Sequence, residues 1–505
     1  MQTEPQADRF AATYDRGEAQ VVWTTLVADL ETPVSAYLKV SAGRPMSFLL
    51  ESVEGGAVRG RYSIIGLDPD LIWRAQDGRV EINRAARTRP DVFVAVDDRP
   101  LHALRALLAE SRIALPEALP PMAAGVFGYL GYDMVREMEE LPSPNPDVIG
   151  TPDAILIRPT VIVVFDAVND TMTVVTPVRP DPAVTAAAAM SRAAERLAAI
   201  VDALERPLDH EAAAMPDGPL TVTPASNTAP EEFAAMVARA KDYIAAGDIF
   251  QVVLAQRFEA PFELPPFSLY RALRRVNPSP FLYYLDFGDH AVAGSSPEIL
   301  VRVRDNVVTI RPLAGTRPRA ANAVEDKALE ADLLADPKEL AEHLMLLDLG
   351  RNDVGRVAQI GTVNVTEQFQ IERFSQVMHI VSNVEGQLDP KYDALDALAG
   401  GFPAGTVSGA PKVRAMEIID ELEKEKRGLY AGCVGYFSAA GEMDTCIVLR
   451  TALVKDGKMY VQAGAGIVAD SDPKAEQQEC VNKAKALFRA AEEARRFASA
   501  ARRGQ

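Results

Sequence analysis

Apolar and polar positions alternate through much of the first part of the chain, in the pattern typical of β-strands. Four segments are expected as strands, at 46–52, 61–65, 155–165 and 171–176. The last two flank Asn169 and Asp170, which favour a tight turn, so they are predicted to form a hairpin. Residues 183–204 are rich in alanine, arginine and glutamate and predict a helix.

A stretch with neither helical nor strand periodicity separates this part from the rest of the chain. Residues 206–230 are rich in proline, aspartate and alanine, a composition typical of a linker. We therefore predict an N-terminal domain over 1–205, a linker over 206–227 and a second domain over 228–505.

The second domain begins with a clear helical pattern. Thr228 is a candidate N-cap, Pro230 lies in the first turn, and Glu231 complements the positive end of the helix dipole. The helix is predicted to run to Ala246 and to stop at Gly247. Five strand-like segments follow with short connections, at 250–258, 281–287, 291–293, 299–303 and 307–310. Short connections favour antiparallel pairing, so the expected fold is α+β, with large antiparallel sheets flanked by helices and an N-terminal α+β portion.

Composition narrows the function classes. Of the 505 residues, 48% are hydrophobic and 25% charged, as in ordinary globular proteins. The net charge of −18 disfavours binding to nucleic acid or to an anionic membrane. The N-terminus lacks a secretory pattern, and no uncharged apolar stretch approaches the ~20 residues needed to span a bilayer. Three widely spaced cysteines favour neither a disulfide framework nor a structural zinc site, and a cytoplasmic location is expected.

A predicted helix after Asp336 carries the first candidate carboxylate. Asp336 can cap this helix, with Pro337 in its first turn and Glu339 at the capping-box position. Leucines at 340, 344 and 347 are expected to form a buried stripe, and Glu342 lies beside it. In isolation, a surface glutamate on an amphipathic helix is the more common interpretation.

A second predicted helix, starting near Asp472, places Glu476, Glu479 and Lys483 on one face. A solvated Glu–Lys pair is the common interpretation of this spacing. The alternative is a cation site, because Mg²⁺ uses only one or two protein carboxylates and keeps its other positions for water and substrate. Glu342 and Glu479 would therefore be sufficient as the protein ligands of one Mg²⁺ ion.

Two glycine-containing segments are candidate anion sites. Residues 462–467 are expected as a Gly-rich turn after a strand, in which backbone N–H groups can approach an anion. Residues 405–412 precede a helix predicted to run from Pro411 to Arg427, and a helix N-terminus of this kind also binds anions. In isolation, an ordinary tight turn is the better interpretation of 462–467, and simple capping by Ser408 explains 405–412 equally well.

Glu298 and His379 complete the candidate set. Glu298 lies at a predicted loop-to-strand junction and could serve as a general acid if its pKa were raised. A solvated strand-end carboxylate is the alternative. His379 lies in the apolar run QVMHIVS, where a satisfied core histidine is an equally good interpretation.

Nine segments in this order resemble the chorismate-utilising enzymes, and most closely the large subunits of anthranilate synthases. They are GDIFQVV from 247, AGSSPEIL from 293, RPLAGTRPR from 311, KELAEHLMLLDLGRND from 338, FSQVMHIVS from 374, AGTVSGAPKVRAMEIID from 404, YAGCVGYF from 430, DTCIVLR from 444 and VQAGAGIVADSDPKAEQQE from 461. The resemblance covers essentially all of 228–495. It implies a lyase that converts chorismate and ammonia to anthranilate and pyruvate, the first committed step of tryptophan biosynthesis.

The resemblance also implies a role for each candidate. Mg²⁺ would be bound by Glu342 and Glu479 with Glu476 nearby. Glu298 would protonate the departing hydroxyl, and His379 and Thr406 would line the reacting ring, His379 assisting the loss of pyruvate. The implied substrate-binding residues are Gly315, Thr316, Tyr430, Arg450, Gly464, Ala465, Gly466 and Lys483.

Two positions distinguish the related activities. Isochorismate and salicylate synthases resembling this chain carry a lysine base at the position of Gln251, and aminodeoxychorismate synthases carry a nucleophilic lysine at the position of Ala314. A neutral amide cannot activate water, and a methyl group cannot form a covalent intermediate. Both residues favour anthranilate synthesis. The alternatives are an aminodeoxychorismate synthase component or a non-catalytic tryptophan-binding regulator.

The family's tryptophan feedback site is matched by LLES, ending at Ser52, and by NPSPFLYYL from 277. The residues carried over are Ser52, Pro280, Phe281 and Leu282, although other members often have Tyr and Met at the last two positions. Cys433 lies in AGCVG, which does not fit a Gly-x-Cys-x-Gly nucleophile elbow. The resemblance therefore implies a separate glutamine amidotransferase subunit as the source of ammonia.

Overall fold

The computed structural model describes all residues except 1, 55–57, 209–221, 375–376 and 499–505. The first part of the chain contributes eight strands and four α-helices. They are α1 (Ala7–Asp15), β1 (Gln20–Val27), α2 (Pro33–Ser41), β2 (Ser47–Glu54), β3 (Val58–Gln76), β4 (Arg79–Asn83), β5 (Val94–Val96), α3 (Pro100–Glu110), β6 (Gly125–Leu130), β7 (Ala154–Asp166), β8 (Thr171–Val178) and α4 (Ala186–Glu205). The predicted hairpin is confirmed as β7 and β8.

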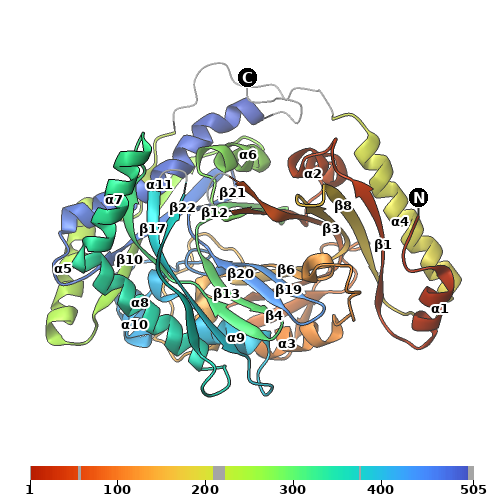
Figure 1. The fold of residues 1–505 in the computed structure, drawn as a ribbon, viewed down its shortest axis with the longest axis horizontal. Coiled ribbons are helices and arrows are strands. Elements are labelled where there is room, and N and C mark those ends of the chain that lie inside the picture. Colours follow the sequence, from red (N-terminus) through yellow and green to blue (C-terminus); the bar gives the residue numbers. More distant parts are fainter. Residues whose placement is uncertain (1, 55–57, 209–221, 375–376, 499–505) are drawn as a thin grey trace.

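The remainder of the chain consists of runs of strands separated by helices, and α5, α7, α8, α10 and α11 lie at one side of the molecule (Figure 1). Its elements are β9 (Ala225–Ser226), α5 (Pro230–Ala246), β10 (Gln251–Pro261), α6 (Pro266–Val276), β11 (Phe281–Asp286), β12 (His290–Ser296), β13 (Ile299–Arg304), β14 (Val307–Ile310), β15 (Leu313–Pro318), α7 (Ala323–Ala335), α8 (Pro337–Gly355), β16 (Asn364–Arg373), β17 (Val377–Gln387), α9 (Ala394–Gly401), the 3₁₀ turn η3 (Gly405–Val407), β18 (Gly409–Ala410), α10 (Lys412–Leu422), β19 (Cys433–Ser438), β20 (Met443–Ile447), β21 (Thr451–Lys455), β22 (Lys458–Ile467) and α11 (Pro473–Ala494).

The strands form two stacked antiparallel layers (Figure 1). One layer runs β10–β22–β21–β12–β11–β2–β3–β7. The other runs β6–β19–β20–β13–β14–β17 and is joined to the first through the β6–β7 pairing. Every strand pairing within the described residues is antiparallel. The α+β prediction is confirmed.

Strand β7 illustrates why the layers are stable. Its sequence AILIRPTVIVVFD is a nearly continuous apolar run, and every residue except the last is buried. A strand covered on both faces needs such a run, whereas a half-exposed strand alternates. Strand β7 pairs with β3, β6 and β8 in the interior of the molecule, and its apolar run fits this position.

Strands from the first part of the chain pair with strands from the second part at two places. Strand β2 pairs with β11, and β6 pairs with β19. The proposed division into 1–205 and 228–505 stays a prediction, and the sheets run continuously across it. Much of the predicted linker, 209–221, lies outside the described residues.

The predicted bounds of α5 are confirmed, but its predicted N-cap is wrong. Helix α5 begins at Pro230 and ends at Ala246 as expected, and Gly247 adopts the left-handed conformation (φ 84°) that ends it. The N-cap is Ala229, not Thr228, because the Glu232 carboxylate accepts a hydrogen bond from the Ala229 backbone N–H.

The predictions for α8 and α10 need correction. Asp336 caps α8 as expected, but Leu344 is 50% exposed and does not belong to the predicted buried stripe. Helix α10 ends at Leu422 rather than Arg427, since the chain turns there to bring Glu423 and Arg427 inward. Ser408 does not cap it, because its hydroxyl donates to the Ala404 carbonyl.

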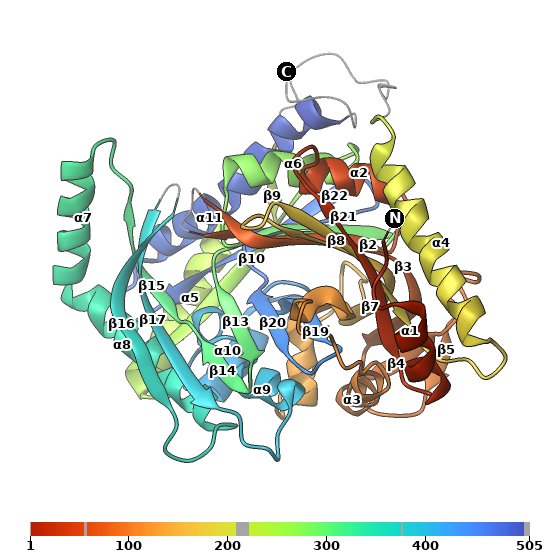
Figure 2. The ribbon, with the colours of Figure 1, turned by 45° about the vertical axis from the view of Figure 1, so that its right-hand side comes forward.

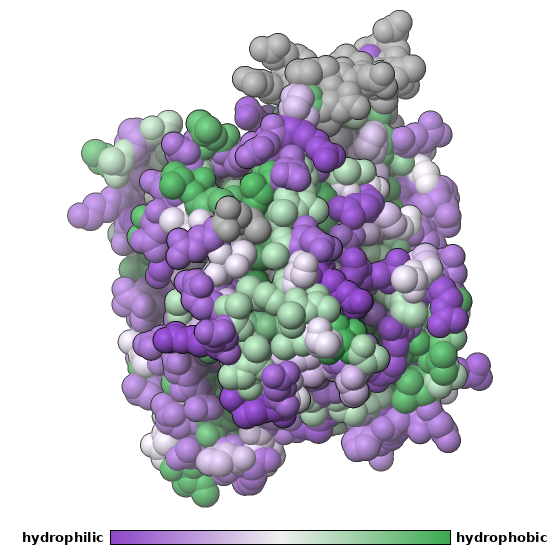
Figure 3. Space-filling view, turned by 90° about the vertical axis from the view of Figure 1, so that its right-hand side faces the viewer, coloured by the Kyte–Doolittle hydropathy of each residue, from purple (hydrophilic) through white to green (hydrophobic). Residues whose placement is uncertain are grey.

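Helices cover the two ends of the molecule. Helices α8 and α11 flank one end of the layers, and α1 and α4 cover the opposite end (Figures 1 and 2). The face that carries α1 and α4 is mainly hydrophilic, with a central area of moderately apolar residues (Figure 3). None of the described helices has both the length and the apolarity needed to cross a bilayer.

Candidate active site

A cavity of about 740 Å³ lies between the β10–β22 end of one layer and β15, β17 and α8 of the other. It brings together all the predicted catalytic and metal residues and every predicted substrate residue except one. These are Gln251, Glu298, Gly315, Thr316, Glu342, His379, Thr406, Tyr430, Arg450, Gly464, Gly466, Glu476, Glu479 and Lys483. The exception is Ala465, which is fully buried in the core, because successive strand residues point to opposite faces.

The predicted Gly-rich turn at 462–467 is instead part of strand β22, paired with β10. Its glycines permit close packing rather than a bend. A Cβ at Gly464 would lie 2.8 Å from Tyr430 Oη, and one at Gly466 would lie 2.6 Å from Gln251 Nε2. At Gly464 the Leu254 carbonyl oxygen is also only 2.9 Å away, so a side chain there would displace backbone, whereas at Gly466 a side chain would displace only the flexible end of Gln251.

Glu298 lies in the short connection between β12 and β13 and is only 5% exposed. Burial raises the pKa of its carboxyl to about 8. Thr406 Oγ1 donates to Glu298 Oε1 (3.1 Å) and opposes this rise, as do the positive charges of Arg450 and Lys483. Desolvation outweighs them, so Glu298 holds a proton at neutral pH and can donate it. The solvated-carboxylate alternative is wrong.

His379 on β17 is held in one tautomer. Its Nδ1 lies 3.0 Å from the Gly315 carbonyl oxygen and 3.1 Å from Thr316 Oγ1. Because a carbonyl only accepts, Nδ1 carries the hydrogen. Nε2 is buried and has no partner among the described residues. Burial and the charge of Arg450 lower the pKa of His379 to about 4, so the ring is neutral and Nε2 can accept a proton.

Arg450 is the main cation deep in this cavity. It follows strand β20 with a left-handed backbone (φ 48°), and burial lowers its pKa while Glu298 raises it. Its guanidinium makes no hydrogen bond or ion pair with another side chain among the described residues. A guanidinium without a partner is suited to grip a ligand carboxylate at two points.

Carboxylates from α8 and α11 converge at the mouth of the cavity. Burial and the neighbouring Glu339 and Glu479 raise the pKa of Glu342, whose Oε1 accepts from Gln251 Nε2 (3.2 Å). Burial and Glu479 likewise raise the pKa of Glu476. Mutual repulsion of this kind is relieved by a bound cation.

The carboxylates fit Mg²⁺ in number and kind. Among the described residues, no three histidine, cysteine, aspartate or glutamate side chains form a ready-made ligand set. Mg²⁺ does not require one, because it takes one or two carboxylates and completes its shell with water and substrate. Glu479 is also paired with Lys483 (2.7 Å), and both side chains are about half exposed (47% and 46%). Such an exposed pair is weak and can rearrange.

Sequence reasoning missed several residues that line this cavity. Lys338 and Glu339 precede Glu342 by four and three residues on α8 and therefore share its face. That helical spacing was visible in the sequence. Asn277, whose buried Nδ2 has no partner among the described residues, gave no comparable signal.

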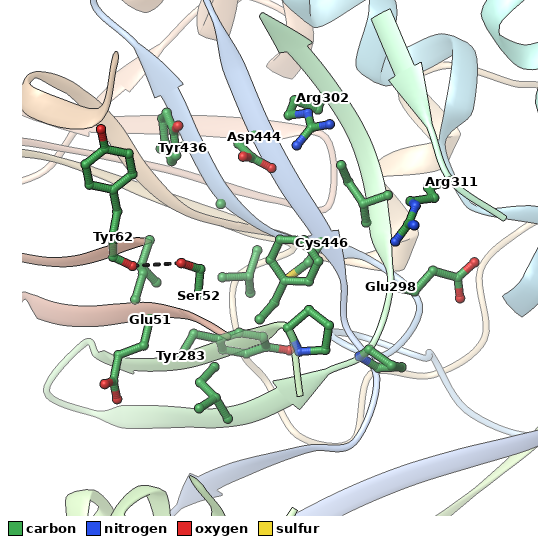
Figure 4. Close-up of a pocket in the computed structure, with 18 of the residues that line it drawn as sticks. Glu51, Ser52, Tyr62, Tyr283, Glu298, Arg302, Arg311, Tyr436, Asp444 and Cys446 are labelled. Carbon is green, nitrogen blue, oxygen red and sulfur yellow. Dashed lines mark hydrogen bonds between the residues drawn. The ribbon is translucent and has the colours of Figure 1, made fainter. Parts of the chain in front are cut away.

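A second cavity, of about 730 Å³, lies between the two layers (Figure 4). It is lined by all four predicted tryptophan-site residues: Ser52, Pro280, Phe281 and Leu282. Apolar and aromatic side chains surround this part, and Ser52 donates to the Tyr62 carbonyl (3.0 Å). Its other part is polar and contains Arg302 and Asp444, which sequence reasoning did not single out. The two cavities share the wall formed by Pro297, Glu298 and Leu313.

Comparison with known proteins gives consistent results. The family model described as "chorismate binding enzyme" matches residues 55–489. "Anthranilate synthase component 1" of Cereibacter sphaeroides is 58% identical over 500 residues, covering 98% of this chain and 99% of that protein. The crystal structure of anthranilate synthase component I from Streptococcus pneumoniae TIGR4 superposes with a TM-score of 0.76 at 38% identity, covering 92% and 98% of the two chains. The isochorismate synthase MenF of Escherichia coli (TM-score 0.68, 21% identity, 96% and 100% covered) shares the fold.

Proposed function

Because this chain belongs to the chorismate binding enzyme family, we propose that it is the large subunit of an anthranilate synthase. It converts chorismate and ammonia to anthranilate, pyruvate and water. The observation that carries this conclusion is 58% identity to a component 1 protein across 98% of the chain. The cavity residues agree with it, since every predicted catalytic position holds a competent side chain there.

The two residues that distinguish the related chorismate-utilising activities, Gln251 and Ala314, also support anthranilate synthesis. Gln251 lies in the cavity and donates to Glu342 Oε1 (3.2 Å), so its amide is engaged and cannot deprotonate water. Ala314 lines the same cavity beside Gly315 and presents only a methyl group where a nucleophilic amine would be needed. Ammonia is therefore the nucleophile, and it adds directly to the ring.

The substrate is held through its charged groups. Arg450 and Lys483 supply positive charge for the carboxylates of chorismate, and the Gly464 carbonyl at the same wall accepts a hydrogen bond from Lys483 Nζ (2.9 Å). Glu342 and Glu479, with Glu476 nearby, would hold Mg²⁺. When bound, Mg²⁺ would supply positive charge that neutralises a substrate carboxylate.

The first chemical step needs a group that gives a proton and the second needs a group that accepts one, and the cavity provides both. Ammonia forms a bond to ring C2 while the C4 hydroxyl leaves. Protonated Glu298 gives that hydroxyl a proton so that it departs as water, and the ammonium group formed on C2 loses one proton to become an amine. In the second step the C2–H bond breaks, the ring becomes aromatic, and the enolpyruvyl group leaves as the enolate of pyruvate, which takes up one proton at its methylene carbon. Neutral His379, with Nε2 free among the described residues, accepts the C2 proton.

Ammonia comes from a second component, which we propose is a glutamine amidotransferase subunit. Relatives of this chain are named component 1. The three cysteines, Cys433, Cys446 and Cys480, are buried with raised pKa values, about 12 for Cys433 and Cys480. Their thiolates are not available for glutamine hydrolysis at neutral pH.

A direct assay tests the function. We expect the purified chain, given chorismate, Mg²⁺ and an ammonium salt, to release anthranilate and pyruvate in equal amounts, followed by anthranilate fluorescence and a coupled pyruvate assay. Isochorismate or an aminodeoxychorismate as the product would instead identify a sister enzyme. Binding of tryptophan without any turnover would indicate a non-catalytic regulator.

We further propose that tryptophan inhibits the enzyme from the second cavity. Its aromatic and apolar part suits an indole ring, and its polar part suits the amino and carboxylate groups. The wall shared through Glu298 gives a short path to the catalytic cavity. Phe281 and Leu282, which replace the more usual Tyr and Met, keep this part of the cavity apolar.

The Phe281→Ala variant is expected to raise the tryptophan concentration for half-inhibition by about tenfold, because Phe281 is partly buried at the cavity wall and truncating its ring removes roughly 1.5 kcal/mol of apolar contact with a bound indole. Initial rates at increasing tryptophan measure this. Val94→Ala, at an exposed apolar position (65% exposed), is the control and should leave inhibition unchanged. Unaltered inhibition in the Phe281 variant would place the tryptophan site elsewhere.

A further inference from the structure

Arg427 is a fully buried cation outside the set of residues assigned to the reaction. It lies in the connection between α10 and β19, and its side chain is 1% exposed. A buried guanidinium is retained only when its donors are all engaged. The role of Arg427 must therefore be sought in the groups that accept hydrogen bonds from it.

The guanidinium joins two backbone carbonyls and one carboxylate. Nε and Nη2 donate to the Glu423 carboxylate (2.9 and 2.6 Å). Burial lowers the pKa of Arg427, but the charge of Glu423 and its hydrogen bonds outweigh burial and leave that pKa raised. Nη1 donates to the Val407 carbonyl of η3 (2.7 Å), and Nη2 donates to the Val253 carbonyl of β10 (2.7 Å).

Glu423 extends the same network. Its Oε1 also accepts from the Ala255 backbone N–H (2.9 Å), so the ion pair holds β10 at two positions. The Arg427 guanidinium further lies over two aromatic rings, with its central carbon 5.4 Å from the centroid of Tyr430 and 4.9 Å from that of Tyr132. A planar cation between two rings is held in orientation as well as in position.

Three of the residues that Arg427 contacts reach the catalytic cavity. Val253, Val407 and Tyr430 line it, whereas Arg427 does not. Val407 directly follows Thr406, whose hydroxyl donates to Glu298. A shift of η3 would move that hydroxyl, and a shift of the Tyr430 ring would change the wall beside Gly464.

We propose that Arg427 is a positioning residue for the reaction, holding η3, β10 and the Tyr430 ring in register around the substrate. The proposal rests on the proposed function, because Thr406 and Tyr430 are assigned through it. Arg427 touches neither the substrate nor the reacting atoms in this arrangement and acts through the residues it holds.

The test compares Arg427→Lys with a matched variant, Arg158→Lys. Lysine keeps the charge but cannot bridge two carbonyls and a carboxylate while lying flat on the rings. Arg158 on β7 is similarly buried (10% exposed) and pairs with Asp70 and Glu110, and neither it nor these partners line the catalytic cavity. Each variant replaces a mostly buried arginine that pairs with carboxylates, although the partners of Arg158 are about one-third exposed and Glu423 is buried. A purely structural role therefore predicts a loss of stability in both variants.

We expect R427K to lower kcat for chorismate consumption by about tenfold to a hundredfold and to raise KM, because misplacement by about 1 Å has effects of this size. R158K should lower Tm but keep kcat and KM within about twofold of wild type, as expected for a substitution whose contacts lie outside the catalytic cavity. Chorismate consumption is followed with an ammonium salt, so the comparison holds whichever product forms. Product identity in the wild type separately tests the proposed function.

A second arm uses the double variant of R427K with Tyr430→Phe. If Arg427 acts through Tyr430, the combined effect on KM is smaller than the product of the single effects. Should R427K fail to fold, Glu423→Gln, which keeps Arg427 but removes the charged partner, replaces it with the same expectation. Unchanged kcat and KM in the variant, or an equal loss in R158K, would overturn the proposal.

Discussion

The Glu479→Gln and Glu342→Gln variants should each lose anthranilate synthesis almost completely, by about a thousandfold in kcat/KM. Charge stabilisation by a bound cation is worth several kcal/mol, and each 1.36 kcal/mol is about tenfold in rate. An amide keeps the shape of the carboxylate but not its charge. Glu342 lies on α8 and Glu479 on α11, and both line the cavity. Glu479 contributes to the raised pKa of Glu342, which shows that the two carboxylates act on each other. Either substitution therefore removes negative charge from the same proposed cation site.

The measurement has two parts. Steady-state rates are taken at increasing Mg²⁺, and calorimetry without chorismate reports metal affinity independently of turnover. Glu493→Gln is the matched control, because it lies on α11 but pairs with Arg496 and does not line the cavity. Wild-type rates and wild-type Mg²⁺ affinity in both cavity variants would show that these carboxylates do not hold the metal.

The second large effect is expected at Glu298. Replacing it with glutamine should lower kcat by about 10²–10⁴, the usual contribution of a general acid. The wild type should also show an alkaline limb in kcat/KM near pH 8, the pKa of Glu298. The sign follows from its role: the acid must hold its proton, so activity is present below this pKa and is lost as the pH rises through it. The limb should be absent in Glu298→Gln.

Thr406→Val provides the companion test for Glu298. The Thr406 hydroxyl donates to Glu298 Oε1, which favours the ionised form and lowers the pKa. Removing this donor should move the alkaline limb of kcat/KM to higher pH. The other groups that act on Glu298, the Leu313 backbone N–H, Arg450 and Lys483, are unchanged in that variant. A limb that stays in place in Thr406→Val, or that persists in Glu298→Gln, would assign it to another group.

Local features of the chain were predictable because they depend on neighbouring residues. The bounds of α5, the hairpin of β7 and β8, and the cap at Asp336 follow from periodicity, turn residues and capping chemistry. The candidate site residues could be found because the nine segments that resemble the family occur in the family's order along the chain. The assignment of each to magnesium, substrate or proton transfer came from the family resemblance and not from spacing.

Errors arose where distant residues decide a local outcome. The segment around Gly464 reads as a turn, yet pairing with β10 makes it a strand whose glycines admit Tyr430 and Gln251. Leu344 fits an apolar stripe but no element covers it, and it is half exposed. Helix α10 stops at Leu422 because Arg427 is drawn inward by carbonyls of β10 and η3.

By itself, the sequence determined most of the helices and strands, the order of the motifs and the identity of the discriminating residues Gln251 and Ala314, since these are properties of single positions and short windows. Only the tertiary structure decided that Glu298 is buried and protonated, that α8 and α11 face each other, and that β2 and β11 bring Ser52 beside Phe281. Burial and charge proximity are sums over groups far apart in the chain. Their effects on pKa and on cavity shape exist only once the two layers have packed.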